Sequence, residues 1–180
     1  VAADLLSQAE HGPDSQVILI TTHEPLIDAV KASIDKLLKI ISREQMVDKA
    51  LSNSRIFLVN NLVEAIALSN AYAPEHLILA TKNAEELADQ VVNAGSVFIG
   101  HFTPEAAGDY ASGTNHTLPT NGYARAYSGV SVDSFVRKVT FQQISREGLK
   151  NVGPSVSVMA EAESLEAHRQ AIEVRLKAIG

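Results

Sequence analysis

Glu75 and His76, neighbours in the segment Ala73-Pro74-Glu75-His76-Leu77, are side chains that could share proton transfer. An imidazole gains and loses a proton near neutral pH, and a carboxylate beside it can act as a second base. The same dipeptide is also common at a solvated surface just before a strand. By itself the pair therefore leaves two readings open, an acid-base site and a surface position.

Three other side chains carry the donor atoms of a metal or substrate site. Gln8 and His11 are three residues apart in a helical segment, so they would share one face of the helix. The alternative is an exposed helix end followed by the turn 12–14. Asp109 follows Gly108 at the entrance to a polar segment, where its carboxylate could point into a cleft or could cap a turn.

The remaining candidates lie further along the chain. His116 in the polar segment is either a loop histidine with local partners or a ligand contact. Glu163 and His168 are five apart in a helical pattern, so they share a face only if the helix breaks at Ser164, which could cap a new turn. No Gly-x-Gly-x-x-Gly or Gly-x-x-x-x-Gly-Lys motif is present, which indicates that a nucleotide is held outside this chain or in an unusual manner.

Composition narrows the class of protein. The chain has 180 residues, 46% hydrophobic and 20% charged, which predicts one globular domain with at most a small appendage. A net charge of -6 without a basic cluster argues against a nucleic-acid partner. Without cysteine, a metal must be held by His, carboxylate or amide groups. With no apolar stretch of about 20 residues and no signal-peptide pattern, we expect a cytoplasmic protein without membrane contact.

Four short apolar runs are predicted as buried strands, and amphipathic helical segments separate them. This alternation predicts an α/β fold with a parallel sheet, as in an incomplete Rossmann-like domain. Three capping boxes, Ser42 with Gln45, Asn61 with Glu64 and Asn83 with Glu86, would begin helices. The strand runs are Val17 to Thr22, Ile56 to Val59, Leu77 to Ala80 and Val97 to Ile99.

The pattern changes after Gly100. Segment 108–122 is rich in Gly, Ser, Thr and Asn and is predicted to be a long loop. A short helix over 132–136, a strand over 139–144 and one or two helices over 156–178 would follow. We expect an α/β part over 1–129 and a small, mainly helical C-terminal appendage over 130–180, which packs on another domain or chain. Because Val1 already lies in a helical pattern, the sequence is expected to be the inside of a longer protein.

Four segments in this order, 5–15, 73–77, 94–98 and 108–120, closely resemble the histidinol dehydrogenase family, and the resemblance extends along essentially the whole chain. The chain looks like the C-terminal portion of such a protein. The resemblance implies a zinc enzyme that oxidises L-histidinol to L-histidine through L-histidinaldehyde. Two NAD molecules would be reduced, in the last two steps of histidine biosynthesis.

The resemblance also implies roles for single residues. Gln8, His11 and Asp109 match zinc ligands, one Zn²⁺ per site, and His168 matches a fourth ligand that comes from the other subunit of a homodimer. Glu75 and His76 match the acid-base pair: His76 would accept the alcohol proton, and Glu75 would activate a water that hydrates the aldehyde. His116 and Glu163 match substrate contacts, Glu163 in the partner's site. The residues expected around the substrate are Gln8, His11, Glu75, His76, Asp109, His116, Glu163 and His168.

Most NAD contacts of the family would lie outside this chain, so the chain alone is expected to be inactive. Two other functions remain open at the level of sequence. One is a zinc-dependent hydrolase in which Glu75 activates a metal-bound water without a redox step. The other is an assembly module without catalysis, whose terminal helices exchange with a partner.

Overall fold

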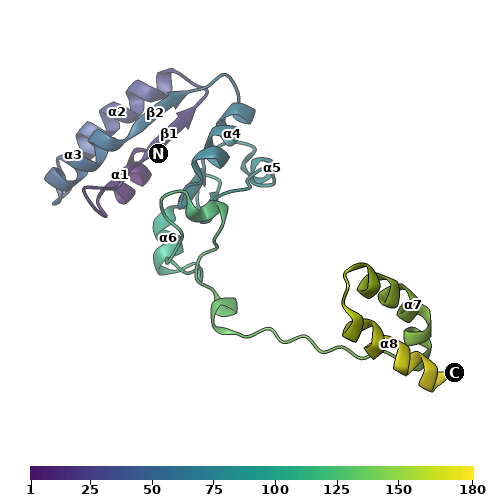
Figure 1. Cartoon of the computed structure of the whole chain (residues 1–180). Helices are drawn as coiled ribbons and strands as arrows, with labels where there is room; N and C mark the ends of the chain where they lie inside the picture. Colours follow the sequence, from purple (N-terminus) through teal and green to yellow (C-terminus); the bar gives the residue numbers. More distant parts are fainter. The chain divides into compact units, whose positions relative to one another are not determined.

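The computed structural model describes residues 1–180 and divides into two compact units, Val1–Val136 and Arg137–Gly180 (Figure 1). The division follows Val136, whereas the sequence suggested a boundary at Gly129. Segment 117–130 belongs to unit 1, and its Arg125 side chain bonds to the helix that ends at Tyr72. Val130 N donates to Thr117 O at 3.0 Å, and the Arg125 guanidinium donates to the Ala71 carbonyl at the end of a unit 1 helix.

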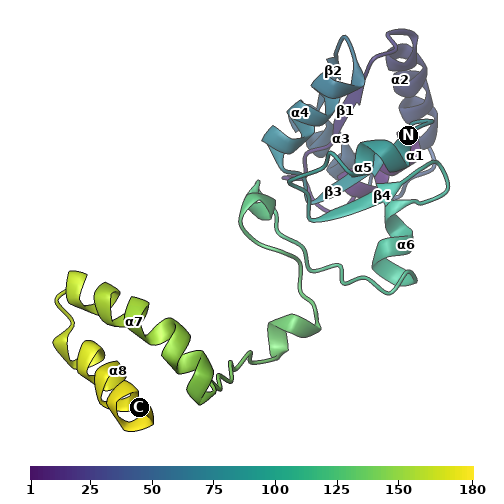
Figure 2. The same ribbon diagram turned by 90° about the vertical axis from the view of Figure 1, so that its right-hand side faces the viewer.

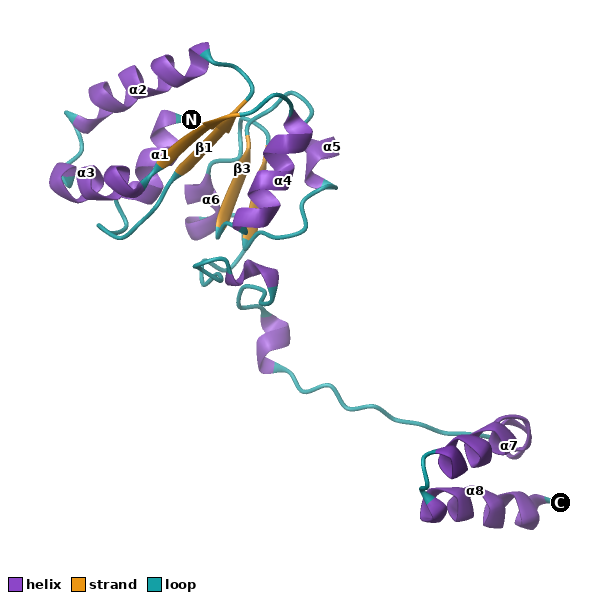
Figure 3. Ribbon diagram, turned by 45° about the horizontal axis from the view of Figure 1, so that its top comes forward, coloured by secondary structure: helices purple, strands orange, loops and turns teal.

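The four predicted strands are present, and they are parallel. They are β1 (Ile18–Thr21), β2 (Arg55–Leu58), β3 (His76–Leu79) and β4 (Ser96–Ile99). They form two separate pairs: Ile18 aligns with Arg55 in β1 and β2, and His76 aligns with Ser96 in β3 and β4. The prediction that run 56–59 is buried is wrong, because the strand Arg55–Leu58 is exposed along its whole length. Figure 3 shows the strands in orange. The α/β class with parallel strands is therefore confirmed, as two β-α-β pairs rather than one continuous sheet.

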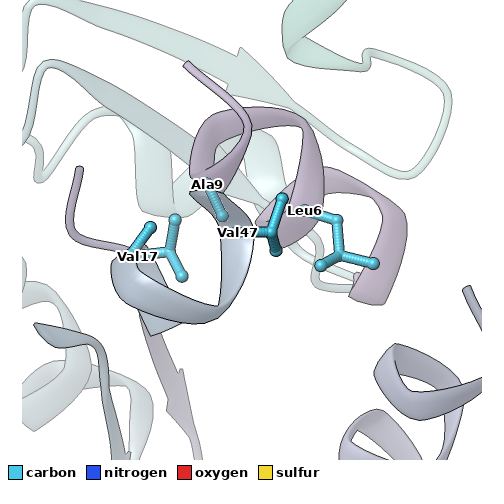
Figure 4. Packing of buried hydrophobic residues seen from close by; sticks show 5 residues of the cluster. Leu6, Ala9, Val17 and Val47 are labelled. Carbon is cyan, nitrogen blue, oxygen red and sulfur yellow. The ribbon is translucent and has the colours of Figure 1, made fainter. Parts of the chain in front are cut away.

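Two clusters of buried apolar residues hold the helices of unit 1 in place. In the first cluster α1 and α3 bury Leu6, Ala9 and Val47 against Val17 (Figure 4). In the second, Ile66 of α4 and Leu87 of α5 pack on Leu79. Burying a Leu or Ile side chain contributes roughly 1.5–3 kcal/mol to the free energy of folding. These contacts therefore hold the helices, and the polar residues at their ends, in place. The helices of unit 1 are α1 (Ala2–Ala9), α2 (Pro25–Leu38), α3 (Glu44–Asn53), α4 (Leu62–Tyr72), α5 (Ala84–Ala88) and α6 (Glu105–Tyr110).

One of the three predicted capping boxes has the expected bond. Asn61 Oδ1 accepts from Glu64 N at 2.9 Å, while the Glu64 carboxylate accepts from Asn60 N at 3.0 Å instead of from Asn61. The prediction at Ser42 is wrong, because α3 begins one residue later than that box requires, after Arg43. Asn83 precedes α5 but makes no side-chain cap bond. Burial of apolar residues, rather than a cap, determines where α3 and α5 begin.

The predicted loop over 108–122 is partly wrong, because α6 includes Gly108 and Asp109. A Cβ built on Gly108 would lie 2.7 Å from Phe98 Cε1, which explains why a glycine is needed inside this helix. At Gly108 the helix backbone itself packs against the Phe98 ring, in the space that a larger side chain would need. The irregular segment begins only after the helix, at Ala111.

Replacing Gly108 by Ala should destabilise unit 1 by about 1–3 kcal/mol, because the added methyl overlaps the Phe98 ring. The better helix propensity of Ala, up to about 1 kcal/mol, is too small to offset that overlap. Urea unfolding measures the change. The double variant Gly108→Ala with Phe98→Leu should regain part of the lost stability, and an unchanged single variant would contradict the packing argument.

Unit 2 is a hairpin of α7 (Arg146–Ala162) and α8 (Glu166–Ile179), two helices that lie side by side in Figure 2. The helix break is confirmed at Ser164, whose φ of 60° lies in the left-handed region. The predicted cap is wrong, because Leu165 is the N-cap of α8 and makes no side-chain cap bond. The predicted strand over 139–144 is also wrong: the segment has no partner strand, and Phe141 is 93% exposed. No helix of either unit has both the length and the apolarity to span a membrane.

Candidate active site

Unit 1 contains a cavity of about 420 Å³, and six of the eight predicted site residues line it. The six come from the end of α1, the start of β3, α6 and the segment after α6. Three further polar residues, Ser15, Gln16 and Thr117, complete the lining. The six are Gln8, His11, Glu75, His76, Asp109 and His116.

Gln8 and His11 line the cavity, but not as one helical face. Helix α1 ends at Ala9, and His11 lies in the bend that follows. His11 N donates to Gln8 O at 3.3 Å, a tight turn that keeps the two side chains near each other. The expected shared helix face is therefore wrong, and a turn at the C-terminus of the helix brings the residues together instead.

Glu75 and His76 reach the cavity through a chain reversal after α4. The helix ends at Tyr72, and Ala73 adopts a left-handed conformation with φ of 57° before Pro74. His76 is then the first residue of β3. This turn brings both side chains to one cavity. The site lies at the amino end of β3, whereas ligands of open α/β sheets usually bind at the carboxyl ends.

Gly95 allows β4 to lie close to the acid-base pair. Gly95 N donates to Pro74 O at 2.9 Å, and Ser96 N donates to Glu75 O at 2.8 Å. A Cβ on Gly95 would lie only 2.5 Å from Glu75 O. Any side chain at this position would push β4 away from the backbone of Glu75.

The His76 ring has a neighbour at each nitrogen and on one side. Nδ1 lies 3.1 Å from Gln8 Oε1, and Nε2 lies 3.7 Å from Glu105 Oε1. The Phe98 ring packs on the imidazole with centroids 5.8 Å apart and planes tilted by 41°. A ring held by these three residues has little freedom to rotate.

Burial brings the pKa values of Glu75 and His76 closer together. Burial lowers the pKa of His76, although the charges of Glu75 and Asp109 act in the opposite direction. Burial raises the pKa of Glu75, although His76 and His11 lower it. The imidazole is thus neutral at pH 7 and able to accept a proton, while the carboxyl holds its proton more tightly than a free glutamate does.

Glu105 is a site residue that the sequence analysis missed. It is the first residue of α6 and only 1% exposed, the bulkiest of the fully buried side chains. Burial raises its pKa, and the nearby Asp109 carboxylate raises it further. Two signals could have revealed it: Pro104 marks a helix start, and Glu105 lies four residues before Asp109, so both fall on one helix face.

The donor atoms at this end of the cavity fit a divalent cation. Ligand atoms of His11, Glu105 and Asp109 all lie within 4.8 Å of one another. Gln8 Nε2 and Glu105 Oε1 are buried without a hydrogen-bond partner, and such atoms usually have one. Nitrogen and oxygen donors of this kind suit Zn²⁺. Since Gln8 Oε1 faces His76, ligation by Gln8 requires its amide to rotate.

His116 lies in the irregular segment after α6. Asn115 Oδ1 accepts from Thr117 N at 2.7 Å, a local turn that places His116 at the rim of the cavity. The other two predicted residues belong to unit 2. Glu163 follows α7, His168 lies in the first turn of α8, and both side chains are exposed.

Comparison with known proteins agrees with this set of residues. A family model described as histidinol dehydrogenase matches residues 1–176. The chain is 59% identical over 179 residues to histidinol dehydrogenase of Bacteroides fragilis strain YCH46, covering 99% of the chain and 42% of that relative. It is 55% identical over 180 residues to the chloroplastic histidinol dehydrogenase of Oryza sativa subsp. japonica, covering 99% of the chain and 38% of that relative.

A solved structure is similar as well. The crystal structure of histidinol dehydrogenase from Elizabethkingia anophelis superimposes with a TM-score of 0.95 and 55% sequence identity. The match covers 99% of this chain and 41% of that one. The chain thus spans less than half the length of the relatives that it matches.

Proposed function

The chain belongs to the histidinol dehydrogenase family, and on that premise we propose that it supplies the acid-base and metal-binding part of an enzyme that oxidises L-histidinol to L-histidine. The observation that carries the proposal is the cavity at the start of β3. There Glu75 and His76 lie beside Gln8, His11 and Asp109.

In the first oxidation, His76 accepts the hydroxyl proton of the alcohol on a ring nitrogen. Its lowered pKa supports this role, because a neutral imidazole is the form that can take the proton. NAD, when bound, supplies the acceptor for the hydride that leaves the same carbon. The product at this stage is L-histidinaldehyde.

In the second oxidation, Glu75 removes a proton from a water molecule that adds to the aldehyde carbon. A second NAD, when bound, would accept the hydride that the hydrate loses, and loss of a hydroxyl proton from the same carbon's hydrate then yields the carboxylic acid. Glu75 directly precedes β3 and His76 is its first residue, and both side chains line the cavity. The two bases can therefore act on the same carbon one after the other. Two proton removals in sequence are a chemical reason for two adjacent bases.

Zn²⁺ would be held by Gln8, His11 and Asp109 and would orient the substrate's amino and imidazole nitrogens. The donor types of His11 and Asp109 suit such an ion, and their ligand atoms lie within 4.8 Å of each other, with Glu105 next to them. We propose that His168 of a second copy is the fourth ligand and that Glu163 of that copy contacts the substrate, in a homodimer. His116 at the rim of the cavity contacts the substrate from this copy.

The 180-residue chain by itself should form no NADH above background when given L-histidinol and NAD. We expect the residues that bind NAD to lie mostly in the part of the relatives that this chain does not cover. Joining the chain to the remaining part of the Bacteroides fragilis protein should restore absorbance at the NADH wavelength. Normal turnover by the chain alone would contradict this division of roles.

A further inference from the structure

Glu105 is buried without the partner that usually stabilises a buried carboxyl group. No lysine or arginine pairs with it, and its Oε1 makes no hydrogen bond. Its side-chain contacts with Asp109 and Gln8 offset only part of the cost of removing a carboxyl group from water, and a leucine at this position would avoid that cost. Packing alone therefore gives no reason for a glutamate at residue 105.

Glu105 lies next to the proposed general base and the proposed metal ligands of the site. Its Oε1 lies 3.7 Å from His76 Nε2, and its donor atoms lie within 4.8 Å of those of His11 and Asp109. Helix α6 presents Glu105 and Asp109 one turn apart. The close contact between Gly108 and Phe98 fixes this helix against the same Phe98 ring that packs on His76.

Each ring nitrogen of His76 faces a different polar neighbour. Gln8 Oε1 is within hydrogen-bond distance of Nδ1, whereas Glu105 Oε1 at 3.7 Å is too far from Nε2 to bond to it. Nε2 thus faces a carboxyl group but is not occupied by it, so the nitrogen stays available to a substrate proton. A carboxylate that is hydrogen-bonded to a histidine fixes the direction of its ring. Glu105 makes no such bond to His76, so it acts on the ring through its charge and its bulk.

We propose that Glu105 is a positioning residue for His76, which holds the imidazole in one orientation between Gln8 and α6. This inference rests on the proposed acid-base function of His76. Glu105 acts through His76 and through the geometry of the site, not as a ligand of the cation.

Imidazole ¹⁵N spectra of the full 180-residue chain test the orientation directly, without any turnover. We expect the tautomer protonated on Nδ1, which donates to Gln8 Oε1, in the unchanged chain, and a larger share of the other tautomer in Glu105→Leu, because a ring that can turn breaks the bond to Gln8. Glu105→Gln, which keeps the shape, should lie closer to the unchanged chain. Glu85→Gln, an exposed substitution in the first turn of α5, is the matched control.

Kinetics and zinc binding complete the test. In the joined protein described above, Glu105→Leu should lower kcat by about 10- to 100-fold with KM unchanged, whereas zinc affinity of the chain should stay the same. A thermal midpoint that does not fall shows that the variant is folded.

Three outcomes separate the possibilities. Unchanged imidazole spectra with unchanged kcat would overturn the inference. Loss of zinc binding in Glu105→Gln would also overturn it, since Glu105 would then be a ligand. If the joined protein with Glu105 intact forms no NADH, the proposed function fails, and the ¹⁵N spectra still decide whether Glu105 orients His76.

Discussion

Replacing His76 by Asn in the joined protein is expected to lower NADH formation from L-histidinol by about 10²- to 10⁴-fold, the usual contribution of a general base. The imidazole that accepts the alcohol proton is lost, while the amide keeps a similar size. Oxidation of L-histidinaldehyde added directly should fall much less, because Glu75 activates the water in that step. Stopped-flow absorbance with each of the two substrates measures the two steps separately.

Glu75→Gln should show the reverse pattern. The alcohol is still oxidised, but the aldehyde step slows and L-histidinaldehyde accumulates, where a carbonyl reagent can trap it. Glu86→Gln, an exposed change in α5, should alter neither step. An equal loss of both steps in both variants would show that the two residues do not divide the work as proposed.

The pH profile gives an independent check on His76. Because burial lowers its pKa, the alcohol step should stay active on lowering the pH to about 6.5 and should fall only below that value, as the imidazole becomes protonated. A loss that begins well above the ordinary histidine range would contradict a buried neutral base.

Replacing Asp109 by Ala is expected to weaken zinc binding by about 100-fold or more, because an anionic ligand is lost. In the metal-free chain the same change should leave stability equal or higher, since Asp109 and the buried Glu105 are like charges one helical turn apart. Opposite signs of the two effects are typical of a site that is built for a ligand rather than for stability.

Zinc titration and thermal unfolding measure the two effects on the same samples. Zinc at a hundred times its Kd should stabilise the unchanged chain by about 2.7 kcal/mol, and a chelator should reverse the gain. His11→Ala should resemble Asp109→Ala, and the exposed Asp89→Asn should bind zinc normally. Tight zinc binding by Asp109→Ala would remove Asp109 from the ligand set.

The sequence by itself determined the fold class and the four strands, and its resemblance to a known family supplied the eight candidate site residues. Strand runs such as 17–22 are apolar apart from Thr21 and Thr22 at the end, and a strand in a parallel pair needs little more than that. The Glu75-His76 pair could also be recognised from the sequence as a candidate acid-base site, because a carboxylate and an imidazole are groups that transfer protons. Local pattern was sufficient wherever a property belongs to consecutive residues.

Only the tertiary structure decided which side chains from distant segments meet. Glu105 resembled an ordinary helix-start residue until α6 packed against Phe98, and Gly95 had no evident role until β4 aligned with β3. The capping box at Ser42 failed for the same reason, since a cap bond of about 1 kcal/mol yields to burial of Val47. Long-range burial outweighs local preference, and it brings the orienting carboxyl group to the base.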